Sequence, residues 1–117
     1  MLLARRPGEV LTLAESVRYS CLLLKRQFPK ARLLLVTPMQ TTAAPDSLIH
    51  QTGDIIEDCG RRLNAVTVRL DRVSQVVSSR EARHKVYTSD GTHTSRRGAR
   101  HIGYLLADKA RTLRLEY

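Results

Sequence analysis

The sequence predicts an α/β fold in which helices flank a partial, doubly wound parallel sheet. The first observation is a short apolar run between Arg32 and Thr37, typical of a strand buried on both faces of a parallel sheet. The second is alternation of apolar and polar residues from Val66 to Leu70, which indicates a half-exposed strand nearer a sheet edge. The third is that segments with helical spacing precede, separate and follow these strands. This alternation is typical of right-handed crossover connections.

The first helix is expected from about residue 10 to residue 28, after a loop at Pro7-Gly8. Thr12 or Glu9 can cap its start, and Pro29 closes it. Its apolar face is formed by Leu13, Val17, Cys21, Leu24 and Phe28, which recur at helical spacing.

A loop rich in Thr, Ala and Pro is expected over residues 39–46, at the carboxyl end of the first strand. Open α/β sheets build their ligand crevices at that edge. Asp46 or Ser47 can then cap a second helix, which ends near Gly60 and Asn64. Residues 71–85 mix charged and β-branched residues, so we expect a loop with a short helix there.

The last helix is expected to start near Thr94 or Ser95. Its narrow apolar face consists of Ala99, Ile102, Gly103, Leu106, Ala110 and Leu113. Arg96, Arg97 and Arg100 lie near its N-terminus, where the helix dipole disfavours cations by a few tenths of a kcal/mol. Solvation explains their presence, and the alternative is an anionic ligand or partner nearby.

The residues before this last helix contain the candidate chemistry. Asp90 and His93 are three residues apart, and Gly91 between them permits a sharp bend. A carboxylate beside an imidazole fixes the histidine tautomer and leaves the second ring nitrogen free to accept a hydroxyl proton. Histidine suits this role because its unperturbed pKa of about 6.5 lies close to neutrality. We therefore predict that Asp90 and His93 form the base half of a nucleophilic triad.

The order strand, helix, strand, Asp90-Gly-Thr-His93 and final helix resembles the C-terminal half of the SGNH (GDSL-type) hydrolases, over about Val10 to Leu113. The block that ends at Gly98 looks especially like the version in carbohydrate acetylesterases of that superfamily, although Thr94 stands where many members have proline. The resemblance implies a flavodoxin-like, three-layer α/β/α fold and hydrolysis of acyl esters, with carbohydrate O-acetyl esters as the candidate substrates.

The other parts that the resemblance implies are absent from this sequence. The family's nucleophile lies in a Gly-Asp-Ser motif, and an asparagine in Gly-x-Asn-Asp donates to the oxyanion. Gly53-Asp54 is followed by Ile55, and the only asparagine, Asn64, is followed by Ala65. We therefore expect residues 1–117 to be one domain, the C-terminal portion of such a hydrolase without its N-terminal part. The expected partners are an ester substrate and either a missing N-terminal half or a second copy of the chain.

A net charge of +9 favours anionic partners in general. The arginines are spread along the chain, and one Phe and four Tyr offer few rings for base stacking, so we do not expect nucleic acid as the main partner. A basic, non-catalytic module that binds nucleic acid or another polyanion is nevertheless the alternative function.

We expect no cofactor and no membrane partner. His84 and His101 flank the motif without metal-ligand spacing, and His50 is expected to be exposed. Cys21 and Cys59 fall at apolar helical positions and are expected to be buried free thiols. No apolar run approaches the roughly 20 residues of a membrane span. The start of the chain, Met1 to Pro7, lacks the pattern of a signal peptide.

Overall fold

The computed structural model describes residues 12–113 and has mixed, loosely α/β architecture. Its sheet has two parallel strands, β1 (Leu34–Val36) and β2 (Val66–Val68), with Leu34 opposite Val66. Helix α2 (Asp46–Arg62) is the crossover between them. The predicted loop at Pro7-Gly8 and the start of the chain lie outside the described residues.

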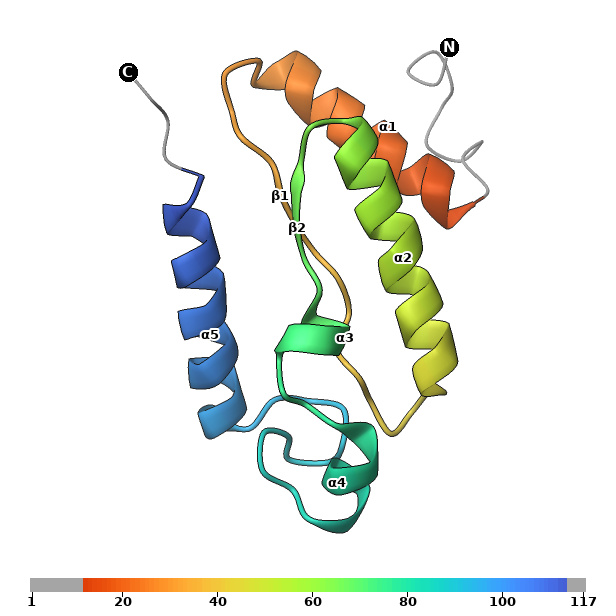
Figure 1. Cartoon of the computed structure of the whole chain (residues 1–117), viewed down its shortest axis with the longest axis vertical. Helices are drawn as coiled ribbons and strands as arrows, with labels where there is room; N and C mark the ends of the chain where they lie inside the picture. Colours follow the sequence, from red (N-terminus) through yellow and green to blue (C-terminus); the bar gives the residue numbers. More distant parts are fainter. Residues whose placement is uncertain (1–11, 114–117) are drawn as a thin grey trace.

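The helices lie on both sides of the strand pair, as Figure 1 shows. α1 (Leu13–Gln27) and α2 lie on one side, and α5 (Arg96–Arg111) lies on the other. Both strands point with their carboxyl ends towards α3 (Leu70–Val73), α4 (Ser78–Arg83) and the loops around them. The predicted candidate residues are thus carried by loops at the carboxyl edge of the sheet.

Two of the three predicted helix starts are confirmed. The Thr12 hydroxyl accepts a hydrogen bond from the Glu15 N–H, 3.1 Å away, at the start of α1. Ser95 caps α5 in the same way through the Gly98 N–H, at 3.1 Å. The cap predicted for α2 is wrong, because Pro45 occupies the N-cap and makes no side-chain cap bond.

The prediction that the first strand is buried on both faces is wrong. β1 is only three residues long, and Val36 is 42% exposed. The Leu33 carbonyl and the Thr37 N–H both bond to β2. Along β1 the peptide groups therefore point alternately towards β2 and towards the edge of the strand that faces away from β2. In residues 12–113 no strand pairs with that edge, which explains the exposure. β2 is also shorter than predicted, since Leu70 already begins α3.

The inward face of α5 differs from the predicted one. Ile102 and Leu106 are half-buried as expected, but Ala99, Gly103 and Ala110 are exposed. Instead, the His101 ring stacks on Tyr87 at 4.6 Å between centroids. Gly98 lies so close to the Tyr87 carbonyl that a Cβ there would overlap it. Helix α5 is therefore anchored through its N-terminal half to the loop that precedes it.

Within residues 12–113 few apolar residues are buried: Cys21, Cys59, Val68, Leu70 and Val76. Both cysteines are free and buried, as predicted. Burial raises the pKa of the Cys21 thiol, and the neighbouring Cys59 adds to the shift. Within residues 12–113, no helix combines the length and apolar content required to cross a bilayer.

Candidate functional site

Residues 88–94 form a tight turn, which we call the Asp–His turn. Thr88 and Thr94 pair as an antiparallel bridge, and the Ser89 N–H donates to the His93 carbonyl at 2.9 Å. Gly91 has a φ of +90°, which residues with a side chain rarely adopt. The glycine in this position therefore permits the bend that brings Asp90 and His93 together.

Asp90 and His93 are in direct contact within this turn. His93 Nδ1 lies 2.7 Å from Asp90 Oδ2, while Asp90 Oδ1 accepts the backbone N–H groups of His93 (2.7 Å) and Thr92 (2.9 Å). The His93 backbone bond, the His93 ring and then the Thr92 bond hold the pKa of Asp90 well below its usual range. An ionised carboxylate can only accept hydrogen bonds, so Nδ1 is the donor, and in the neutral form of the ring Nε2 keeps its lone pair.

The pair is open to solvent. The His93 side chain is 79% exposed and that of Asp90 is 53% exposed. The His93 ring is therefore accessible to water rather than enclosed in a crevice.

A buried glutamate holds the segment before the Asp–His turn. The Glu81 carboxylate is 0% exposed and accepts the N–H groups of Val86, Tyr87 and Thr88 at 3.1, 3.1 and 2.8 Å. It also accepts the Thr88 hydroxyl at 2.7 Å, and that hydroxyl in turn accepts the Gly91 N–H at 3.0 Å. Burial acts to raise the pKa of Glu81, but these bonds outweigh it and lower the pKa. Glu81 thus fixes the backbone from which the turn projects.

The loop between β1 and α2 holds the turn from its other side. The Thr42 N–H donates to the Gly91 carbonyl at 3.0 Å, and the hydroxyls of Thr41 and Thr92 lie 2.8 Å apart. A Cβ on Gly91 would overlap the Thr42 side chain. The turn is therefore fixed against the loop that leaves the carboxyl end of β1.

A second aspartate–histidine pair lies at the same edge of the sheet. His50 Nδ1 is 2.6 Å from Asp71 Oδ2, the Asp71 side chain is fully buried, and that of His50 is 37% exposed. Thr37, the residue after β1, donates its hydroxyl to Asp71 Oδ1 at 3.1 Å. The sequence did not predict this pair: His50 was expected to be exposed, and the two residues are 21 positions apart.

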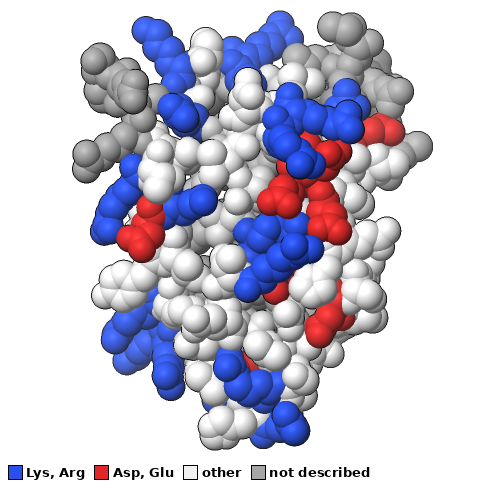
Figure 2. All heavy atoms as spheres, in the orientation of Figure 1, with Lys and Arg blue, Asp and Glu red and all other residues white. Residues whose placement is uncertain are grey.

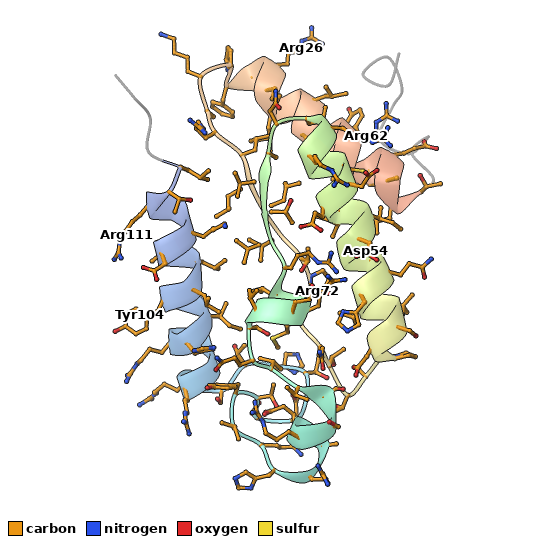
Figure 3. All side chains as sticks on the ribbon, in the orientation of Figure 1. Arg26, Asp54, Arg62, Arg72, Tyr104 and Arg111 are labelled. Carbon is orange, nitrogen blue, oxygen red and sulfur yellow. The ribbon has the colours of Figure 1, made fainter. Side chains whose placement is uncertain are left out.

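Arg69 neutralises the buried Asp71. Its Nε and Nη2 atoms bond to the two carboxylate oxygens at 2.9 and 2.7 Å. Burial acts to raise the pKa of Asp71, but the bonds from Arg69 and His50 lower it to about 2. Arg69 Nη1 also contacts Asp54 (2.8 Å) and Glu57 (3.1 Å) on α2. We call Arg69 and its three acidic partners the Arg69 cluster. Figure 3 shows Asp54 on α2 and Arg72 on α3, which faces it.

The Arg69 cluster accounts for Gly53-Asp54, for which the sequence alone suggested no role. Gly53-Asp54 lies inside α2 as predicted. A Cβ on Gly53 would approach the Arg69 guanidinium to 2.7–2.9 Å, so the glycine makes room for it while Asp54 binds it.

The serines near His93 make backbone contacts. Ser95 caps α5 and donates to the Val86 carbonyl at 3.3 Å, and Ser89 donates to the His93 carbonyl at 3.4 Å. His101 is held by Tyr87 and by the Ser74 carbonyl, 2.7 Å from its Nε2. In the described part of the chain, no three His, Cys, Asp or Glu side chains come together as a metal site would require.

A cavity of about 530 Å³ lies between β2 and the C-terminal half of α5. Its walls are mainly apolar and include Val68, Val73 and Leu105. Neither Asp90 nor His93 lines it. The cavity and the Asp–His turn are thus separate features.

No protein-family model matches the chain, and comparison with curated proteins and with solved structures finds no significant match. Function must therefore be inferred from the geometry of the site.

Proposed function

We propose that this chain contributes the aspartate and histidine of an SGNH-type acyl-ester hydrolase, with carbohydrate O-acetyl esters as the candidate substrates. The observation that supports the proposal is the 2.7 Å contact between His93 Nδ1 and an ionised Asp90. It prepares Nε2 to take a proton from a serine and to return it to the leaving alcohol, while Asp90 stabilises the imidazolium.

The nucleophile and the oxyanion donors have to come from outside this chain. It contains neither a Gly-Asp-Ser nor a Gly-x-Asn-Asp segment, and the hydroxyls nearest in sequence to His93 bond to backbone carbonyls. The exposure of His93 agrees with this requirement, because a solvent-facing ring is accessible to a segment supplied by another part of a protein.

His93 is a better candidate base than His50. Asp71, the partner of His50, already binds Arg69 through both of its oxygens and Thr37 through one. A carboxylate neutralised in this way stabilises an imidazolium less, since its charge is shared with a guanidinium. Asp90 accepts only backbone N–H groups and His93 among the described residues.

The test is turnover of 4-nitrophenyl acetate by a protein that contains this chain together with a Gly-Asp-Ser segment. His93→Ala should lower kcat by about 10²–10⁴-fold with the circular dichroism spectrum unchanged. The matched control, His50→Ala, should leave most of the activity. Unchanged turnover in the His93 variant would dismiss the proposal.

A second measurement uses the chain by itself. A fluorophosphonate probe, which labels activated serines, should give no labelling because the chain lacks the nucleophile motif. Strong labelling that depends on His93 would contradict this part of the proposal, because it would place the nucleophile within these residues.

A further inference from the structure

The outward face of α5 is basic and carries an exposed aromatic ring. At 100° per residue, four arginines and a tyrosine fall within an arc of about 100° on this helix, with Ala107 among them. They are Arg96, Arg97, Arg100, Tyr104 and Arg111. Gly98, which packs against the Tyr87 carbonyl, lies on the opposite side of the helix, and His101, which bonds to the Ser74 carbonyl, lies on the flank next to Arg97. We call the five residues the α5 stripe.

The positive charge of the α5 stripe is largely uncompensated. Among the described residues, Arg96, Arg97 and Arg100 form no ion pair, and the first turn of α5 has no acidic residue. Asp108, the acidic residue within α5, pairs with Arg111 at 2.8 Å. Figure 2 shows basic side chains without acidic ones over the N-terminal half of α5, whereas acidic and basic side chains alternate over α2.

This arrangement is electrostatically unfavourable without a partner. The positive end of the helix dipole lies beside Arg96 and Arg97, and Arg96 and Arg100 are like charges one turn apart. A bound polyanion would relieve both repulsions. The Arg97 guanidinium also lies over the Tyr87 ring, 5.5 Å from its centroid, which orients it without neutralising it.

Tyr104 gives the stripe a second kind of contact. At 70%, Tyr104 has the highest exposed fraction of the large hydrophobic residues in the described region, and Figure 3 shows it projecting away from the body of the molecule. A Cβ built on Gly103, the residue before it, would meet no atom within 4 Å, so the neighbouring helix surface is open as well. An exposed aromatic ring between arginines is the combination that binds unpaired bases and their phosphates.

We propose that the α5 stripe binds single-stranded nucleic acid. The arginines contact phosphates over about 22 Å, the distance from Arg96 to Arg111 along the helix, and Tyr104 stacks on a base. The even spread of arginine along the sequence concealed this surface, because its members come together only on the folded helix. The proposal is independent of the ester chemistry and does not involve Asp90 or His93.

The test is fluorescence anisotropy with a labelled oligothymidylate of about 12 nucleotides, titrated between about 20 and 200 mM salt. The triple variant Arg96→Ala/Arg97→Ala/Arg100→Ala should weaken binding more than 10-fold at low salt. It should also reduce the slope of log K against log salt by about 2, since each lost phosphate contact contributes about 0.7.

A matched triple variant controls for net charge. Arg26→Ala/Lys30→Ala/Arg32→Ala removes the same charge near the end of α1, from exposed side chains with no ion pair among residues 12–113. Its affinity should stay within about threefold of the wild type. Equal losses in the two triple variants would overturn the proposal, because binding would then follow total charge alone.

Tyr104 distinguishes nucleic acid from other polyanions. Tyr104→Ala should weaken oligothymidylate binding by about fivefold or more, and Tyr104→Phe, which keeps the ring, should not. Heparin, a polyanion without bases, should bind the wild type and Tyr104→Ala alike. No loss with Tyr104→Ala, or no binding of the oligonucleotide at low salt, would overturn the proposal.

Discussion

Replacing Glu81 should destabilise the fold, and the loss of stability should depend on whether the new side chain keeps an oxygen in the position of Oε1. Oε1 accepts all four groups, three backbone N–H donors and the Thr88 hydroxyl, whereas Oε2 accepts only a second, longer bond from Val86. Glu81→Ala removes every acceptor. At about 1–1.5 kcal/mol for each of three backbone donors, the free energy of unfolding should fall by about 3–5 kcal/mol.

Glu81→Gln separates the contribution of the charge from that of the acceptor. Its carbonyl can keep the Oε1 bonds, while its NH₂ group would face the Val86 N–H and Arg80, whose Nε lies 3.6 Å from Oε2. The cost should be about 1–2 kcal/mol. Asp108→Ala removes an exposed carboxylate that pairs with Arg111 among residues 12–113, and it should change stability by about 0.5 kcal/mol or less.

Urea unfolding followed by circular dichroism measures these differences. The folded-state pKa of Glu81 is lowered, so its ionised form contributes stability above the unfolded-state pKa of about 4.3 and loses it as pH falls through the folded value. The difference in the free energy of unfolding between the wild type and Glu81→Gln should therefore become smaller below about pH 4. A loss under about 1 kcal/mol for Glu81→Ala at pH 7 would refute the role of this carboxylate.

Three further outcomes follow from the packing. Gly98→Ala should lower the melting temperature because its Cβ would overlap a backbone carbonyl, whereas Gly103→Ala, exposed on the same helix, should raise stability by up to about 1 kcal/mol. Asp71→Asn should lower the free energy of unfolding, measured in urea at pH 7, by about 3–5 kcal/mol. This difference from the wild type should become smaller between about pH 4 and 2, because the pKa of Asp71 is about 2 in the folded state and higher in the unfolded state. Ellman's reagent should modify the buried Cys21 and Cys59 slowly until denaturant is added.

The features that the sequence predicted correctly are local ones. Thr12 and Ser95 each bond to an N–H three residues ahead, so the capping signal and its partner lie in the same short segment. The same holds for Asp90 and His93, whose contact depends on a three-residue spacing and a glycine between them. Hydrophobic periodicity likewise located α1 and α2 within a few residues, because a buried helix face repeats within one turn.

The features that the sequence did not predict depend on residues distant in the chain. Glu81 lies between Arg80 and Arg83 and has the pattern of a solvated helix surface, yet its side chain is turned towards the backbone of residues 86–88. Asp71 meets partners 21 and 34 positions away, which become neighbours only when the two strands align. The signal available was position, because Thr37 ends one predicted strand, Asp71 follows the other, and the two strands were expected to be parallel.

The two aspartate–histidine pairs have nearly the same Nδ1–Oδ2 distance, but Asp90 is exposed and Asp71 is buried. This difference in solvent exposure constrains the proposed hydrolase. The attraction between unit charges 4 Å apart is about 1 kcal/mol in water and about 4 kcal/mol at an effective dielectric constant of 20. Asp90 therefore does little to stabilise a protonated His93 while both are exposed, although its hydrogen bond still sets the tautomer. A segment that brings the serine must consequently also cover the Asp–His turn.

In such an assembly the His93 ring should become protected from modification by diethylpyrocarbonate in the solvent, while the reactivity of His50 should stay unchanged. A reactive, unprotected His93 in an active enzyme would show that the base is elsewhere.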